Sequence, residues 1–167
     1  IAAVSYDSLK KALEQAVPAA NGAKHIVIEL TKQADTTTYE AQLPTRILQS
    51  EDNFLLSVQT PYATLQLPGG LLSGAGIDAE QVSVRVAEGS RDKLDAATRE
   101  RIGNHPLIEL SLTANGEEVA WGSGANVTVS VPYTPTAEER LNPERIVVWY
   151  IDGEGRTTAI PNGRYDA

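Results

Sequence analysis

Val127-Thr128-Val129-Ser130-Val131 places an apolar residue at every second position, with a small hydroxyl residue in each gap. Successive side chains of a β-strand point to opposite faces of a sheet, so this spacing predicts a strand with one buried face. The same alternation recurs along most of the chain and predicts about ten short strands. They lie at residues 26–30, 39–43, 56–59, 63–67, 82–86, 108–112, 119–121, 127–131, 146–150 and 157–160.

Three segments have a helical pattern instead. Near the N-terminus, Tyr6, Leu9 and Leu13 recur every three to four residues, which predicts an amphipathic helix. Two shorter helical insertions are predicted at residues 92–102 and 136–139. The second begins with Thr-x-x-Glu, the spacing of a capping box in which each side chain bonds the backbone of the other residue.

The order of these elements indicates the fold class. Strands that follow one another without crossover helices favour a mainly β fold, an antiparallel β-sandwich or open barrel with an N-terminal helix and two short helical insertions. Asn115-Gly116 and residues 152–155 have the composition of hairpin turns. We expect one β-rich module over residues 1–167, in which residues 1–22 form the helix and turn and residues 23–167 the sandwich.

One short pattern, Gln-Leu-Pro-x-x-x-Leu, occurs twice, at residues 42–48 and 66–72. Each copy closes a predicted strand. Proline cannot donate a ladder hydrogen bond, so it ends the pairing, and the leucine that follows can fold back over the edge of the core. We interpret the two copies as similar strand-to-turn corners.

Composition narrows the classes of function. The chain has 14 Lys and Arg against 22 Asp and Glu, and the basic residues are scattered singly, which argues against nucleic acid and anionic membrane as partners. It contains no Cys, which excludes disulfides, zinc–thiolate sites and thiol nucleophiles. No apolar run reaches the roughly 20 residues of a membrane span. Because the chain begins at Ile1 and has no Met, we expect a processed chain or an excised part of a larger protein.

The sequence carries no recognisable catalytic motif. His25 and His105 are the only histidines, they lie on different elements, and neither has a second metal ligand at a close spacing. A nucleophile elbow, a Walker loop and a dinucleotide fingerprint are all missing from the sequence. We therefore expect a non-enzymatic protein with no catalytic residues, no metal site and no cofactor, and we interpret both histidines as surface or strand-edge residues.

Three acidic pairs have the residue types that glycosidases and calcium sites use. Each pair also has a local structural reason, namely edge-strand charge, the dipole of a helix N-terminus, or turn preference. A calcium ion that staples a loop and a catalytic carboxylate pair remain as alternatives. The pairs are Glu117-Glu118, Glu138-Glu139, and Asp152 with Glu154.

Exposed aromatic rings are what a carbohydrate-binding module would use, because the faces of sugars stack on them. Trp149 lies in residues 146–151, a run that is apolar on both faces, so we predict that it is in the core. Trp121 ends a predicted strand beside a glycine and is the best candidate for exposure. Together with Tyr62 and Tyr133, it forms the candidate carbohydrate-binding site.

Four segments of the C-terminal half carry a family resemblance: NHPLIELSL at 104–112, VTVSVPYTPTAEE at 127–139, NPERIVVWYID at 142–152 and PNGRYD at 161–166. They resemble a module of surface proteins that carry S-layer homology domains in Paenibacillus-like and related Gram-positive bacteria. Upstream segments fit the same pattern, so the resemblance covers most of the chain. The C-terminal arrangement also has a loose likeness to ZU5-type β domains, which mediate protein contacts.

The resemblance implies a non-catalytic structural or interaction module of a secreted, cell-wall-associated protein at the S-layer. Such modules lie between enzymatic or adhesive domains and the repeats that hold the protein to the wall. The expected partner is a cell-wall or polysaccharide glycan, or a surface protein. The alternative function is a carbohydrate-binding module of a polysaccharide-degrading surface enzyme.

Modules that look like this one usually continue past the Arg-Tyr-Asp segment at 164–166 into one more strand. If that final strand is missing, the sheet has an open edge beside the last hairpin. An open edge can accept a strand from another chain, so we expect a homo-oligomer formed by strand exchange as one behaviour of this chain.

Overall fold

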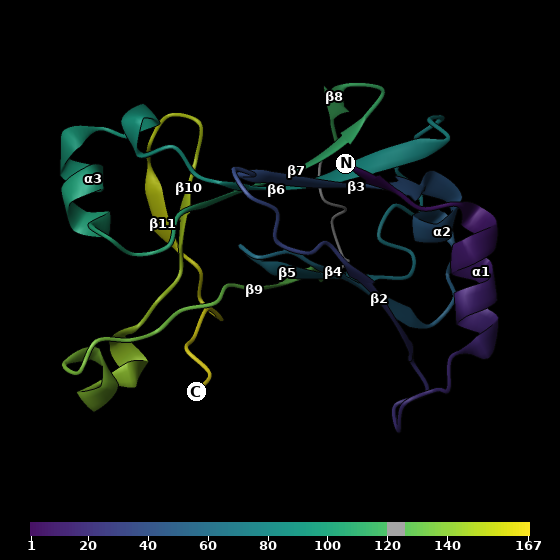
Figure 1. Ribbon diagram of the computed structural model, residues 1–167, viewed down its shortest axis with the longest axis horizontal. Coiled ribbons are helices and arrows are strands. Elements are labelled where there is room, and N and C mark those ends of the chain that lie inside the picture. The colour runs from purple at the N-terminus through teal and green to yellow at the C-terminus, as the bar shows by residue number, and fades with distance from the viewer. Residues whose placement is uncertain (120–125) are drawn as a thin grey trace. The chain divides into compact units, whose positions relative to one another are not determined.

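The computed structural model describes residues 1–119 and 126–167, which fold into two compact units (Figure 1). Unit 1 comprises Ile1–Gly89 and Ile108–Val131. Unit 2 comprises Ser90–Leu107 and Pro132–Ala167. Each unit is therefore built from two separate segments of the chain. The expectation of one module over residues 1–167 stays a prediction.

The predicted mainly β class is confirmed, and the described residues form eleven strands in three open sheets with no closed barrel. The first sheet of unit 1 has the order β1-β3-β6-β7-β8, and the second has the order β2-β4-β5-β9. The first contains β1 (Ala2–Ala3), β3 (Thr38–Pro44), β6 (Gln81–Glu88), β7 (Ile108–Ala114) and β8 (Glu117–Glu118). The second contains β2 (Lys24–Glu29), β4 (Phe54–Gln59), β5 (Thr64–Pro68) and β9 (Thr128–Ser130).

The pairing of strands differs from the prediction in two places. β1 pairs with β3, and β2 pairs with β4, in parallel, so the expectation of purely antiparallel sheets is wrong. A parallel pair needs a long connection between its strands. Between β2 and β4 the chain passes through β3 of the other sheet and through the short helix α2 (Thr45–Gln49), and this excursion provides it.

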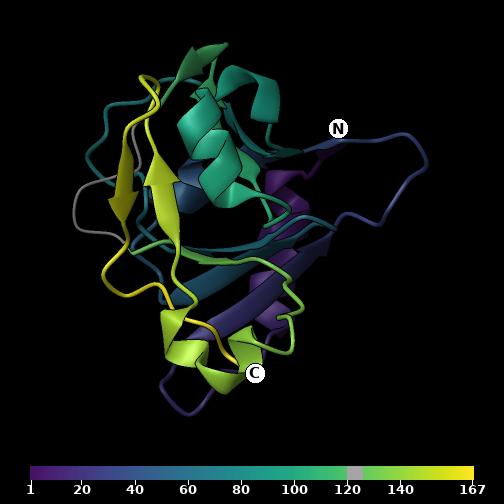
Figure 2. The same cartoon turned by 90° about the vertical axis from the view of Figure 1, so that its left-hand side faces the viewer.

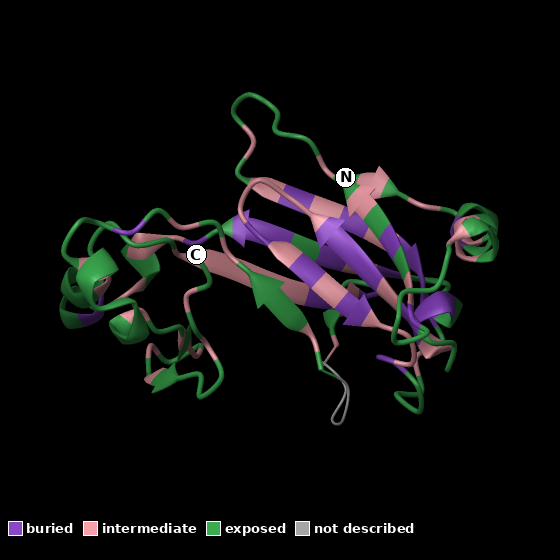
Figure 3. Cartoon of the chain, turned by 90° about the horizontal axis from the view of Figure 1, so that it is seen from below, coloured by how far each residue is buried: buried purple, intermediate pink, exposed green. Residues whose placement is uncertain are grey.

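The core of unit 1 lies between its two sheets, which form separate layers in Figure 1. Leu43 and Val84 from the first sheet and Leu56 and Leu65 from the second belong to one buried cluster. Buried and partly exposed residues alternate along most of β3 and along β5, and Figure 3 shows such alternation. This alternation is the period of two that the sequence predicts.

The predicted N-terminal helix is confirmed as α1 (Tyr6–Gln15). Ser5 caps it by accepting a hydrogen bond from the Ser8 amide at 3.2 Å. Leu9 is the residue through which the helix enters the core. The helix ends at Gln15, ahead of Pro18.

The two Gln-Leu-Pro corners lie side by side. Pro44 is the last residue of β3 and Pro68 the last residue of β5. Leu48 and Leu72, which end the two copies of the pattern, are both completely buried, and the Leu72 amide donates to the Leu48 carbonyl at 2.9 Å. The first corner continues into α2, a helix that the sequence pattern did not predict.

Unit 2 contains short elements, namely the 3-10 turns η1 (Arg91–Lys93), η2 (Glu139–Leu141) and η3 (Pro143–Arg145), the helix α3 (Ala96–Ile102), and the hairpin of β10 (Trp149–Ile151) and β11 (Thr157–Ala159). Figures 1 and 2 both show α3 beside the hairpin. The predicted insertion at 92–102 is thus a 3-10 turn followed by a helix, and the one at 136–139 is a turn that leads into η2.

The predicted position of Trp149 in the core is wrong. Its ring is half-buried, and the guanidinium carbon of Arg101 lies 4.2 Å from the ring centroid. The hairpin has two strands, and α3 covers one of its faces, so this small sheet provides no apolar interior for the ring. Among the described residues, no helix has the length and apolar content that a membrane span requires.

Candidate functional site

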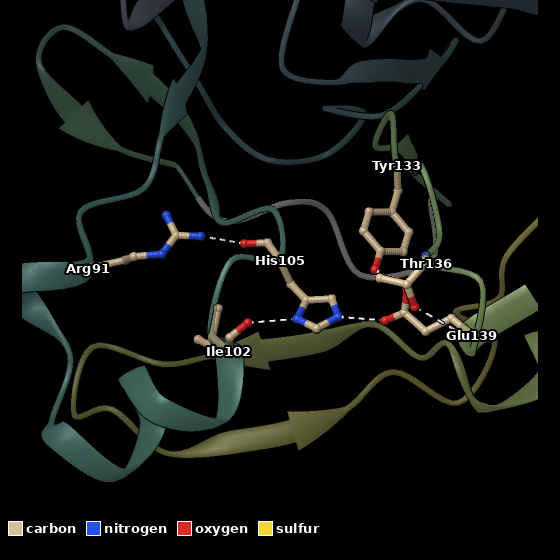
Figure 4. Close-up of polar contacts among 6 residues, drawn as sticks. All are labelled: Arg91, Ile102, His105, Tyr133, Thr136 and Glu139. Atoms are coloured by element: carbon tan, nitrogen blue, oxygen red, sulfur yellow. Dashed lines mark hydrogen bonds and ion pairs between the residues drawn. The ribbon is translucent and has the colours of Figure 1, made fainter.

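A cluster of titratable side chains lies in unit 2, where His105 meets Glu139 from a distant part of the chain (Figure 4). His105 follows the end of α3, in a turn that begins at Gly103. Gly103 has a φ of 54°, in the left-handed region that glycine favours. Glu139 is the first residue of η2, and Tyr133 precedes it on the same segment. Two segments of unit 2 thus supply the cluster.

The Glu139 carboxylate is the centre of the cluster. Its Oε2 accepts from the Tyr133 hydroxyl at 2.6 Å and from the Thr136 amide at 2.8 Å, and its Oε1 lies 2.8 Å from His105 Nε2. The Glu139 amide in turn donates to the Thr136 hydroxyl at 3.3 Å, so the predicted capping box is confirmed. The Tyr133 hydrogen bond, followed by those from His105 and Thr136, lowers the pKa of Glu139 to about 2.

Both ring nitrogens of His105 face oxygen acceptors. Nε2 contacts Glu139, and Nδ1 lies 2.7 Å from the Ile102 carbonyl oxygen. A neutral imidazole has one N–H group, so both contacts are hydrogen bonds only when the ring is protonated. The bond to Glu139, together with the Ile102 carbonyl, raises the pKa of His105, and partial burial opposes them.

Tyr133 is held in its neutral form. Its hydroxyl donates to an ionised carboxylate, and this bond, with desolvation, raises the pKa of Tyr133 to about 12. The Tyr133 ring lies against the His105 ring, with a centroid distance of 5.6 Å and an interplanar angle of 37°. The phenol therefore orients the carboxylate on one side and covers the imidazole on the other.

Arg91 fixes the turn on which His105 lies. Its Nε donates to the Gly103 carbonyl at 3.1 Å, and its Nη2 donates to the His105 carbonyl. Arg99 in turn donates to the Arg91 carbonyl at 3.2 Å. Carbonyl groups at the end of a helix lack partners within the helix, so these guanidinium groups satisfy the backbone there.

A histidine beside a carboxylate is two-thirds of a nucleophile-activating triad, which makes the cluster the first place to look for chemistry. A general base needs a free ring nitrogen that can take a proton from the nucleophile. In this cluster, the Ile102 carbonyl and Glu139 occupy both nitrogens of His105. The arrangement links two segments of chain through the imidazole, and both of its ring nitrogens face acceptors of the protein itself.

The interpretation of both histidines as surface or strand-edge residues is confirmed, because both are exposed. His105 is exposed at the surface, as expected, but it is bonded to Glu139 from the distant segment. Among the described residues, no three His, Cys, Asp or Glu side chains are grouped to hold a metal ion. One partial signal for the site is visible in the sequence, namely the capping box that positions Glu139.

Asp152 has the turn role that its position suggests. Its Oδ1 accepts from the Glu154 and Arg156 amides, each at 2.9 Å, and its Oδ2 contacts Arg156 Nε at 2.7 Å. The bonds from the Arg156 side chain and amide lower the pKa of Asp152. The carboxylate is thus engaged within its own hairpin, and Glu117 and Glu118 lie exposed on β8. A calcium ion bound at such a loop stays a prediction.

The outcome differs for each of the three predicted carbohydrate-binding residues. Trp121 lies outside the described residues. Tyr62 is half-buried in unit 1, where its hydroxyl donates to the Thr36 carbonyl at 3.3 Å and its ring lies 5.9 Å from that of Tyr39. Burial, then the charge of Glu88, raises the pKa of Tyr62. Tyr133 belongs to unit 2, and its hydroxyl is bonded to Glu139.

Of the aromatic residues that the structure describes, a different one is exposed. Tyr150 on β10 is 60% exposed, and in the hairpin register it lies opposite Thr158. Val148 and Ile160, joined by a backbone hydrogen bond of 2.9 Å, extend the same face and are 43% and 37% exposed. We call these four residues the hairpin face. Trp149, which alternates with them, points to the opposite face and meets Arg101.

The sequence could not locate the hairpin face, because residues 146–151 are apolar at every position. Such a run fits a buried strand as well as an exposed hairpin, and periodicity does not separate the two. Comparisons of the chain with protein-family models, with curated proteins and with solved structures found no match, so its resemblance to modules of S-layer homology proteins stays a prediction.

Proposed function

We propose that the chain is a non-catalytic structural and interaction module of a cell-wall-associated extracellular protein. The observation that carries this proposal is the hairpin face, on which Val148, Tyr150 and Ile160 are exposed together. Grouped apolar side chains on a surface typically mark a place where another molecule binds. A tyrosine among aliphatic residues is a common composition for the centre of a binding surface.

The cluster around Glu139 supports a non-catalytic role. Its histidine, tyrosine and carboxylate are engaged in internal hydrogen bonds, which suits a part that keeps a surface in shape. The two sheets of unit 1 with a shared core are consistent with the sandwich that we predict for such modules. The resemblance to modules of surface proteins indicates the location at the cell wall.

The proposal is tested by sedimenting the purified protein with cell walls of a Gram-positive bacterium. We expect the protein to be retained, and a variant with Val148→Ser and Tyr150→Ser to lose retention. Val17 is 86% exposed in unit 1, so Val17→Ser is a matched control that removes apolar surface elsewhere. Equal retention of all three proteins would contradict the hairpin face as the site, and no retention of any would contradict the wall-binding module.

A carbohydrate-binding module is the second candidate, and the exposure of Tyr150 favours it. An exposed phenol ring with Thr158 beside it offers a stacking surface and a hydroxyl group, which a sugar ring could use. Tyr62 and Tyr133 are weaker candidates than the sequence indicates, because both are half-buried and their rings lie against those of Tyr39 and His105. Binding to insoluble polysaccharide that Tyr150→Ala abolishes and Tyr150→Phe preserves would support it, whereas an equal loss in Trp121→Ala alone would return the site to Trp121.

A further inference from the structure

Unit 2 is assembled from two segments of chain, residues 90–107 and 132–167. Two side-chain contacts that bridge these segments are the stacking of Arg101 on Trp149 and the bond between His105 and Glu139. Arginine keeps its charge at every pH that a protein experiences, whereas histidine changes charge near neutrality. The second contact is therefore the one that protons can control.

We propose that His105 and Glu139 form a proton-controlled latch, which joins the two segments of unit 2 when the imidazole is protonated and loosens when it is neutral. The inference does not depend on the proposed function. It rests on the positions of the two ring nitrogens and on the bonds that fix the groups around them.

Geometry gives the latch its dependence on the proton. With one N–H group, the neutral ring can donate either to the Ile102 carbonyl or to Glu139, and its other nitrogen then faces an oxygen at 2.7 or 2.8 Å. Two lone pairs at that distance repel each other. If the proton stays on Nδ1, the local bond within the first segment survives and the bond across to Glu139 is lost.

The charged and titratable groups around His105 keep their own charge state over the neutral range. Glu139 stays ionised, because its pKa is about 2. Tyr133 stays neutral, because its pKa is about 12. Arg91, from η1, donates to the backbone carbonyl of His105 and not to its ring, as Figure 4 shows. Over the neutral range, the ring of His105 is thus the group in this cluster whose charge changes.

The direction of the switch follows from the sign of the shift. The Glu139 bond raises the pKa of His105, so the protonated ring is favoured in the folded unit. Its contribution is present in full below the pKa of a free histidine and is lost as the pH rises through the raised value. The latch is closed below the pKa of a free histidine and loosens as the pH rises through the raised value.

The test is an NMR titration of the two histidine rings together with the backbone amides, from pH 5 to pH 9. We expect the Thr136 and Glu139 amides to report the same midpoint as the His105 ring. In a Glu139→Gln variant, which keeps an acceptor but removes the charge, that midpoint should fall by about one pH unit. The matched control is His25→Gln, which removes the other, exposed histidine on β2 of unit 1 and should leave these signals unchanged.

Two results would overturn the latch. One is a His105 midpoint that is the same in Glu139→Gln as in the unchanged protein. The other is a transition of the Thr136 amide that persists in His105→Gln, because glutamine does not titrate. Signals from the core of unit 1, such as the Val84 amide, verify that each variant is folded. Tyr133→Phe serves as a second variant, in which His105 should keep its transition.

Discussion

Unit 1 is held together by buried aliphatic side chains, whereas unit 2 is held together by polar and charged contacts. In the described part of the chain, the buried hydrophobic residues all belong to unit 1, with Leu65 and Val84 as examples. Unit 2 is stabilised by polar contacts instead. Asp95 caps α3, Arg101 stacks on Trp149, and His105 is bonded to Glu139. The two units of one chain thus use different physical forces.

The distribution of arginine agrees with this contrast between an apolar unit 1 and a polar unit 2. Most arginines of the chain lie in unit 2, and several of them bond backbone carbonyls or stack on a ring. Burial of apolar surface is insensitive to salt and to moderate changes of pH, whereas exposed charged contacts weaken with both. We therefore expect unit 2 to open before unit 1 does. The arginines of unit 2 are Arg91, Arg99, Arg101, Arg140, Arg145, Arg156 and Arg164.

The largest effect is expected from a cavity in unit 1. Leu65 is completely buried between the sheets, and Leu65→Ala should lower the free energy of unfolding by about 2–5 kcal/mol, measured in urea. Val27 on β2 is exposed, so Val27→Ala is the matched control and should change little. A loss below about 1 kcal/mol for Leu65→Ala would mean that unit 1 does not depend on close packing.

A smaller effect, of opposite sign, is expected at Thr45. Its hydroxyl is buried at the start of α2 and has no hydrogen-bond partner among the described residues. Removing an unsatisfied buried hydroxyl should stabilise the protein, so Thr45→Val is expected to raise the free energy of unfolding by about 1 kcal/mol. Thr45→Ala removes the methyl group as well and should be less stable than the valine variant. A valine variant that is less stable than the unchanged protein would show that the hydroxyl finds a partner.

A third prediction compares one kind of contact in both units. Arg101 stacks on Trp149 in unit 2, and Arg46 lies 3.6 Å from the ring centroid of Tyr6 in unit 1. Each stacking contact contributes about 0.5–1 kcal/mol at an exposed site. Arg101→Gln should speed hydrogen exchange of the α3 amides, because this stacking contact joins α3 to the hairpin. Arg46→Gln should leave the central strands of unit 1 protected, because buried apolar side chains hold them. If the α3 amides exchanged at the same rate in both variants, the Arg101 contact would not be what protects α3, and this difference between the two units would be contradicted.

Sequence patterns predicted unit 1 better than unit 2. The alternation along β3, β5 and β6 follows from local geometry, so it is visible in the order of the residues. The parallel pairing of β2 with β4 depends on where the chain returns after an excursion, which no local pattern records. Asn115-Gly116 was recognisable because its turn requires positive φ at both positions, and the structure has 52° and 80° there.

The contacts of unit 2 are the ones that local patterns miss. The capping box that holds Glu139 spans four residues and was predicted, whereas the partner of its other oxygen, His105, lies on a different segment. The same holds for Trp149, whose neighbour Arg101 lies on α3. A run of apolar residues favours a core position only where another apolar layer covers it, and the neighbour that Trp149 meets on α3 is the guanidinium group of Arg101.

The smallest effect is expected for the Thr136 amide signal in acidic solution. The pKa of Glu139 is lowered to about 2 in the folded unit, so its contribution is present above the pKa of a free glutamate and is lost only as the pH falls through about 2. Below the pKa of a free histidine, the latch is closed at both ends, because His105 is protonated and Glu139 stays ionised. The Thr136 amide, followed by NMR, should therefore show no transition between about pH 6 and pH 4. A transition near pH 4.5 would mean that Glu139 titrates as a free carboxyl, and that unit 2 is not held by the bonds around it.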